Sequence, residues 1–133
     1  MMQYKGYKDL GCYIHGRLLK IFISSLVKKF PSHEKYLLSA QFIDASRSIT
    51  TNIAEGYGRY TFTDTRNFFI FARGSLTETM EHFATAFDEK YISDQELKEG
   101  EGKCELVFKL INGYINYLDK SKKQAKQQNG PNS

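Results

Sequence analysis

Apolar residues recur at helical spacing in four long segments of the chain, and turn-forming or polar residues separate these segments. Spacings of three and four residues between apolar positions are typical of amphipathic helices. The pattern predicts helices over residues 7–29, 32–56, 64–90 and 103–120. The 133 residues include only two Pro and ten Gly, which favours long helices over many short strands. We therefore expect an all-α fold, and the length is that of a single domain with its own core, which we place at residues 1–120.

The first predicted helix has a broad apolar side and a basic opposite side. Pro31 ends it, because proline cannot continue a helix and disfavours helical backbone in the residue before it. The apolar side, which we expect to face the core, consists of Leu10, Ile14, Leu18, Ile21 and Phe22, widened by Leu19, Ile23 and Leu26. The solvent-facing side consists of Tyr13, Arg17, Lys20, Ser24 and Lys28.

The second predicted helix starts at capping residues and ends at a glycine corner. Ser32 is suited to cap its first turn, where Glu34 also favours the helix dipole. Its apolar side consists of Phe42, Ala45, Ile49, Ile53 and Gly56. We expect Gly56 and Gly58 to give the chain the positive-φ freedom to turn back. Because no strand precedes it, this Gly-x-Gly matches a helix C-terminus better than a nucleotide-binding loop.

The third predicted helix is apolar on two sides. Its main side consists of Phe69, Leu76, Met80, Phe83 and Phe87, and Thr61, Thr63 and Asp64 offer caps at its start. Phe68 and Phe71 lie on the far side with His82. A helix in an isolated four-helix bundle needs one apolar stripe, so the second side indicates a subunit interface. The alternative is that Phe68 and Phe71 reach sideways into a wide core. Gly74 costs about 1 kcal/mol relative to Ala inside a helix, which we attribute to a close helix crossing.

The segment after the third helix mixes signals that favour and oppose a helix. Residues 93–96 have helix-start chemistry, but Gly100 and Gly102 weaken a helix that runs through them. We therefore expect a linker at 91–102 before the last helix, whose core side consists of Val107, Leu110, Ile111, Tyr114 and Leu118. Residues 121–133 lack large apolar side chains. We expect a disordered basic and polar tail there, because burial cannot offset its ordering entropy.

Catalytic and metal-binding patterns are missing from the sequence. Cys12 and Cys104 lie in separate predicted helices without a Cys-x-x-Cys or Cys/His cluster, so we interpret them as reduced, half-buried thiols and expect no zinc site. Glu78 and His82 are four residues apart and either share a ligand or form a helix-surface or interface contact, which is the commoner role of such a pair. We expect a non-enzymatic, cytoplasmic protein with no metal, no cofactor and no membrane span.

Polar side chains line a stripe at the edge of the apolar side of the second helix and continue on the third. The set consists of Ser48, Asn52, Glu55, Arg59, Arg73, Ser75 and Glu78. Arginine offers five donors that carboxylates accept in paired geometry. We expect a buried polar network that specifies how helices or subunits assemble, with a ligand or nucleic-acid site as the alternative.

The net charge of +4 is unevenly distributed along the chain. Residues 1–31 carry six basic residues and one Asp, whereas residues 63–90 carry three basic and five acidic residues. A basic first helix and a basic tail are suited to phosphate, although surface lysines also serve solubility alone.

Two linked motifs identify a family. They are Gln41, Ala45, Ser48-Ile49, Asn52-Ile53-Ala54-Glu55-Gly56 and Gly58-Arg59, followed by Ala72-Arg73-Gly74-Ser75-Leu76 and Glu78. From Tyr7 to Lys120 the chain resembles the bacterial four-helix-bundle family first noted as open reading frames in intervening sequences of 23S rRNA genes, often labelled ribosomal proteins. The resemblance implies an up-and-down antiparallel four-helix bundle and a ring-like homopentamer. A related accessory protein of diversity-generating retroelements binds nucleic acid and a reverse transcriptase. Ile43 and Asp44 stand where family members typically carry basic residues, and Arg47 restores one charge.

Two functional hypotheses follow from the charge and the resemblance. The first is an oligomer that binds RNA or DNA through basic surfaces, for which the candidate residues are Arg17, Lys20, Lys28, Lys29, Arg47, Lys122 and Lys123. The second is an interaction scaffold that binds an acidic partner protein, with the polar set used only for assembly. In both cases we expect a homo-oligomer whose candidate interface residues are Phe68, Phe71 and His82.

Overall fold

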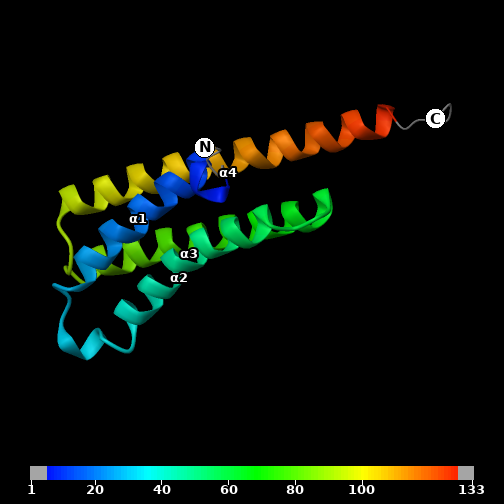
Figure 1. Cartoon of the computed structure of the whole chain (residues 1–133). Coiled ribbons are helices and arrows are strands. Elements are labelled where there is room, and N and C mark those ends of the chain that lie inside the picture. Colours follow the sequence, from blue (N-terminus) through cyan, green and yellow to red (C-terminus); the bar gives the residue numbers. More distant parts are fainter. Residues whose placement is uncertain (1–5, 129–133) are drawn as a thin grey trace, which may run out of the picture.

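Four α-helices form an antiparallel up-and-down bundle, as the sequence predicts (Figure 1). The computed structural model describes residues 6–128. Its elements are η1 (Tyr7–Asp9), α1 (Gly11–Val27), η2 (Ser32–Glu34), α2 (Leu38–Tyr57), α3 (Phe62–Asp88) and α4 (Asp94–Gln128). Each helix contacts the next in the chain, and α1 returns to contact α4. No helix in the described part of the chain is long and apolar enough to span a membrane.

The core lies along the axis between the four helices and is built from large apolar side chains. The largest fully buried residues include Phe42, Phe69, Phe83, Leu19, Ile23, Ile49, Ile53, Leu76 and Ile111. The expected apolar side of α2 is buried along its whole length. On α3 the expected side is buried at Phe69, Leu76 and Phe83, whereas Met80 is 39% exposed.

Helix α1 buries only part of the broad apolar side that the sequence predicts, because Leu19, Ile23 and Leu26 lie in the core as expected but other members do not. The buried positions are Cys12, Gly16, Leu19, Ile23 and Leu26. Ile14, Leu18 and Ile21 were expected in the core but are 43–48% exposed. Both sides of α1 are apolar, so periodicity alone does not tell which one faces inward. The buried side includes Gly16, which lets α1 approach α2 closely.

The start of α2 lies later than predicted. Ser32 does not cap it; residues 32–34 form η2 instead, and α2 begins at Leu38 without a side-chain cap at Leu37. The Glu34 carboxylate accepts a 3.4 Å hydrogen bond from the Leu38 backbone N–H and a 2.8 Å bond from the Tyr91 hydroxyl. The acidic residue therefore supports the helix start from the preceding turn and ties it to the end of α3.

The corner between α2 and α3 does not use positive-φ glycine. Gly58 has φ −84°, and within residues 6–128 only Lys90, in the α3–α4 turn, is a non-glycine residue with positive φ. Gly56 is required for close packing instead, because a Cβ at this position lies 2.8 Å from Phe68 Cβ. Thr61 caps α3 by accepting a hydrogen bond from the Asp64 backbone N–H.

Helix α4 is longer than predicted at both ends. Ser93 and Glu96 form a reciprocal capping box, with the Ser93 hydroxyl accepting from the Glu96 N–H at 3.1 Å and the Glu96 carboxylate accepting from the Ser93 N–H at 2.9 Å. The predicted linker at 91–102 is therefore mostly helix, and Gly100 is buried against Phe83. The cap and this packing outweigh the low helix propensity of glycine.

The predicted disordered tail is partly helical. Residues 121–128 continue α4, and residues 129–133 lie outside the described part of the chain. Lys, Gln and Ala have high helix propensity, and extending an existing helix needs no new nucleus. In Figure 1 this end of α4 extends past the other helices.

Candidate functional site

Three cations from two helices gather where α1 crosses α2. Lys20 lies on α1 and donates a 3.2 Å hydrogen bond from Nζ to Thr50 Oγ1 on α2. Partial burial lowers the pKa of Lys20, and the nearby charges of Arg17 on α1 and Arg47 on α2 lower it further. Residues 10–33 contain no acidic residue. These residues, which we call the α1–α2 basic cluster (Arg17, Lys20 and Arg47), form a local concentration of positive charge.

The close approach of the two helices places this cluster. A Cβ built at Gly16 lies 3.2 Å from Thr50 Cγ2, so a larger residue there would push α1 away from α2. The small glycine therefore brings Lys20 within reach of Thr50. Arg17 and Arg47 are both exposed, which leaves their guanidinium groups accessible to an anion.

The remaining basic candidates lie elsewhere on the bundle. Lys28 and Lys29 follow the far end of α1, and Lys29 Nζ pairs with Glu96 Oε2 at 2.7 Å. The Glu96 carboxylate thus offsets the positive charge of Lys29. The seven predicted residues are thus divided among three places, and the α1–α2 basic cluster is the place that joins residues from two helices.

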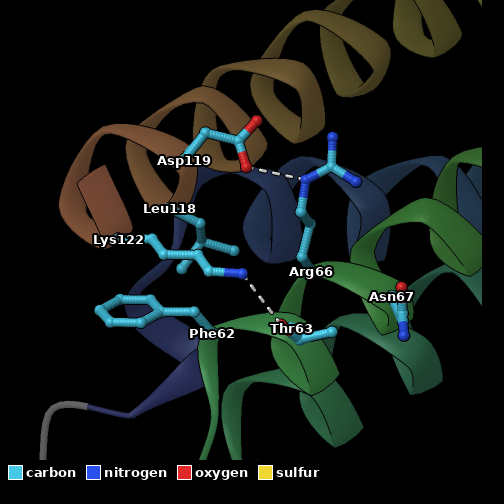
Figure 2. Close-up of a pocket in the computed structure, with 7 residues that line it drawn as sticks. All are labelled: Phe62, Thr63, Arg66, Asn67, Leu118, Asp119 and Lys122. Carbon is cyan, nitrogen blue, oxygen red and sulfur yellow. Dashed lines mark hydrogen bonds and ion pairs between the residues drawn. The ribbon is translucent and has the colours of Figure 1, made fainter. Parts of the chain in front are cut away.

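Lys122 and Lys123 lie on α4 opposite the α2–α3 corner. Lys122 lines a cavity of about 290 Å³ between the start of α3 and α4, and its Nζ donates to Thr63 Oγ1 at 3.2 Å. Figure 2 shows this contact beside the Phe62 ring, with Arg66 paired to Asp119 on the other side of the cavity. The Arg66 Nε to Asp119 Oδ1 distance is 2.8 Å.

The first part of the predicted polar set forms a seam between α2 and α3. Ser48 Oγ and Ser75 Oγ are 2.8 Å apart, and the Asn52 amide donates to both the Ser48 carbonyl and the Ser48 hydroxyl, at 2.8 and 3.0 Å. All three side chains are partly buried. This seam contributes directional contacts to the α2–α3 interface.

The other members of the set lie on α2, on α3 and in the corner between them, and they do not join this seam. Arg59 pairs with Glu55 at 3.0 Å, one turn earlier, and its guanidinium lies 4.5 Å from the centre of the Phe68 ring. Arg73 instead donates to Asn112 Oδ1 on α4 at 2.8 Å. Glu78 Oε1 lies 3.6 Å from His82 Nε2.

The predicted interface residues differ in exposure. Phe71 is 55% exposed and packs edge-on against the half-buried Phe68. His82 lies against Phe42, with 12% of its side chain exposed, and its buried Nε2 has no hydrogen-bond partner within the described structure. Most of the Phe71 side chain is therefore accessible for contact with another molecule, whereas little of the His82 side chain is.

Two apolar surfaces were not identified from the sequence. One is the outer side of α1, formed by Ile14, Leu18 and Ile21, which pattern analysis assigned to the core. The other is a cavity of about 670 Å³ between α3 and α4, whose lining includes Met80 and Phe108, each 39% exposed. This cavity depends on the distance between α3 and α4. The spacing of apolar residues within one helix does not predict that distance.

The two cysteines are more buried than expected. Cys12 and Cys104 are free thiols, 3% and 0% exposed. Burial raises the pKa of Cys12 to about 11 and that of Cys104 to about 12. Both therefore stay protonated near neutral pH, a form that is a poor nucleophile.

Comparison with known proteins identifies the family. Comparison with curated proteins finds no significant match. A crystal structure of a protein of unknown function from the S23 ribosomal protein family of Bacteroides thetaiotaomicron VPI-5482 has the same fold. The TM-score is 0.75 at 21% identity, over 82% of this chain and 98% of that chain. The model of the 23S rRNA-intervening sequence protein family matches residues 8–113, and the chain therefore belongs to that family.

Proposed function

We propose that the protein is a non-enzymatic, oligomeric helical bundle that binds nucleic acid through basic surfaces. The observation that carries the proposal is the α1–α2 basic cluster, in which Arg17 and Arg47 lie close enough to Lys20 to lower its pKa. Phosphate groups relieve the mutual repulsion of such cations and release counterions when they bind. The family name refers to an intervening sequence in rRNA, which agrees with a nucleic-acid context.

Fluorescence anisotropy tests this proposal with labelled RNA and DNA over a series of salt concentrations. We expect binding at low salt. The logarithm of the affinity should then fall linearly with the logarithm of the salt concentration. No binding at low salt, or affinity that does not depend on salt, would contradict a phosphate-binding function.

We propose that the outer side of α1 holds the subunits together. Ile14, Leu18 and Ile21 are spaced by four and three residues and thus share one side of the helix, opposite the buried side. A helix that is apolar on opposite sides is typical of burial on both sides. The pentamer implied by the family resemblance is one assembly that this surface supports, and Phe71 extends the exposed apolar surface to α3.

Light scattering at micromolar concentration tests the assembly. We expect the unmodified protein to be an oligomer and Leu18→Glu to dissociate it. Leu37→Glu is the matched control, because Leu37 is 57% exposed before α2 and away from the outer side of α1. A monomer before any substitution would refute the proposed assembly.

The second candidate function is a scaffold that binds an acidic partner protein. The observation that favours it is that the basic Arg17 lies on α1 close to the exposed apolar residues Ile14 and Leu18, with which it lines one cavity. Nucleic acid does not require such an apolar surface, whereas protein interfaces combine both types of contact. Pull-down from lysate with and without nuclease separates the two functions. A protein partner that remains after nuclease treatment would favour the scaffold.

A further inference from the structure

Exposed aromatic side chains gather at one end of the bundle, where the α2–α3 corner faces the C-terminal half of α4. Tyr60 in the corner is 101% exposed, and Tyr117 on α4 is 60% exposed. Tyr57 and Phe62 flank the corner and are 37% and 39% exposed. A side chain as open to solvent as Tyr60 contributes nothing to the core, so the packing of this chain does not explain it.

The surface beside three of these aromatics is hollowed, and Tyr117 lies next to it, with its ring 5.6 Å from that of Tyr114 in the lining. A cavity of about 220 Å³ is lined by Tyr57, Tyr60 and Phe62 together with residues of α3 and α4. It adjoins the cavity of about 290 Å³ that contains Lys122, because Phe62 and Leu118 line both. The two cavities are therefore neighbours, the smaller one with aromatic walls and the larger one with a lysine in its lining.

Positive charge lies beside the two cavities, on the C-terminal part of α4. Residues 116–126 of α4 carry four lysines and one aspartate, a net charge of +3. Lys122 Nζ is bonded to the neutral Thr63 hydroxyl, whereas Arg59, which lines the smaller cavity, is paired with Glu55 and adds no net charge. The aspartate in this count is Asp119, which is paired with Arg66 of α3. Exposed rings and nearby lysines are thus combined within one surface.

We propose that this end of the bundle, the corner platform (Tyr57, Tyr60, Phe62, Tyr117 and Lys122), binds the unpaired bases of a single-stranded nucleic acid. The inference rests on the proposed nucleic-acid function and specifies its substrate as single-stranded. Proteins that bind single strands combine a positively charged groove with aromatic rings on which successive bases stack. Bases stack on Tyr60 and Tyr117, and Lys122, which lines the adjoining cavity, binds a backbone phosphate. A base-paired duplex has no free base faces to offer these rings.

Fluorescence anisotropy with a labelled oligoadenylate RNA of about 16 nucleotides, near the upper size of single-strand sites, tests the platform. Base stacking on one aromatic ring contributes about 1–3 kcal/mol, so Tyr60→Ala weakens binding by about 5-fold to 150-fold. Tyr60→Phe keeps the ring and leaves affinity within about twofold on the same scale. Tyr36→Ala is the matched control, since Tyr36 is also 82% exposed but precedes α2. We expect Tyr36→Ala to bind the oligoadenylate with unchanged affinity. We also expect Tyr60→Ala to bind an RNA duplex as tightly as the unmodified protein does.

A direct readout of stacking is available because the chain contains no tryptophan. In Tyr60→Trp the indole emission is quenched by the oligoadenylate and not by inorganic phosphate. In Tyr36→Trp neither the oligoadenylate nor inorganic phosphate changes the indole emission.

The outcomes separate this inference from the proposed function on which it rests. If the unmodified protein binds neither RNA, the proposed function fails. If it binds and Tyr60→Ala binds the oligoadenylate as tightly as before, only the corner platform is refuted. A Tyr60→Ala protein that binds RNA normally but loses its oligomeric state would assign the aromatics to contact between copies and overturn the proposal.

Discussion

Gly100 and Gly102 lie two residues apart in α4 in opposite environments. A Cβ built at Gly100 overlaps the Phe83 ring in the core, whereas a Cβ at Gly102 has no neighbour within 4 Å. Gly100→Ala should therefore destabilise the fold by about 1–3 kcal/mol through overpacking. Gly102→Ala should stabilise it by up to about 1 kcal/mol through helix propensity.

Urea unfolding at one fixed protein concentration measures both substitutions. Similar shifts of the unfolding midpoint in both variants would contradict the packing described for Gly100.

Gly74 in α3 resembles Gly102, because a Cβ built at either position has no neighbour within 4 Å. The predicted close crossing at Gly74 is therefore wrong for contacts within one chain.

Glu96 combines a helix cap with an ion pair, and the two are separable. The bond from Lys29 lowers the pKa of the Glu96 carboxyl most, followed by the bond from the Ser93 N–H. A folded-state pKa below the unfolded value means that the charge stabilises the fold above about pH 4.3 and that this contribution is lost as the pH falls. Glu96→Gln retains the cap but not the charge.

We expect Glu96→Gln to be less stable than the unmodified protein near neutral pH. The loss should be below about 1 kcal/mol, because the ion pair is largely exposed. The difference should shrink as the pH falls from about 4.3 toward about 3, because acid protonates the carboxyl and the ion pair with Lys29 is lost progressively. Urea unfolding at the two pH values measures it, with the exposed Glu99→Gln as control. A difference that persists unchanged at low pH would mean that the charge is not its cause.

At the scale of single residues, the sequence predicts local chemistry better than tertiary contact. The helix-start signal at 93–96 is present as a capping box, and Thr61 caps α3 as expected. The reason for Gly100 lies in Phe83, on a neighbouring helix. Helix propensity depends only on the residues of the helix itself and does not include packing against this ring. It therefore predicts a weakened helix at Gly100.

At the scale of helices, α2 and α3 are joined by a polar seam as well as by apolar packing. Because the Ser48 and Ser75 hydroxyls bond each other, each single substitution to Ala leaves a partly buried hydroxyl without this partner. Ser48→Ala and Ser75→Ala should each cost about 1 kcal/mol. The double variant should cost less than the sum, because no unpaired hydroxyl remains.

A double-mutant cycle by urea unfolding measures this coupling. Thr77→Ala is a control, because the exposed Thr77 hydroxyl bonds only within α3, to the Arg73 carbonyl. Adding it to Ser48→Ala should give an additive loss. Additivity of the two serine substitutions as well would show that the hydroxyls do not act as a pair.

Helix α1 shows the limit of periodicity for whole elements. The pattern predicts a helix in the right part of the chain, but the apolar set it assigns to the core is too broad, and only Leu19, Ile23 and Leu26 of that set are fully buried. Gly16 and Cys12 are poor hydrophobic signals, yet small size is what the close contact with α2 requires. The residues left outside, Ile14, Leu18 and Ile21, form the exposed surface at which we propose that copies of the chain meet.

At the scale of the whole molecule, charge and helix order together create the candidate site. The basic residues were identified from the sequence, but their grouping was not, because Arg17 and Arg47 are far apart in the chain and meet only through the crossing of α1 and α2. The fold class follows from periodicity, and the family motifs point to the bundle topology. The aromatic end of the bundle brings together α2, α3 and α4 and is visible only in the assembled structure.

The salt dependence of nucleic-acid affinity in charge variants tests the central claim most directly. Arg17→Gln with Arg47→Gln removes two positive charges from the α1–α2 basic cluster and leaves Lys20 bonded to Thr50. Lys98→Gln with Lys109→Gln removes two exposed charges from α4 and is the matched control. Each lost phosphate contact reduces the slope of log affinity against log salt by about 0.7–0.9. The account predicts a reduction of about 1.4–1.8 for the arginine pair and none for the lysine pair, and equal slopes for all three proteins would contradict it.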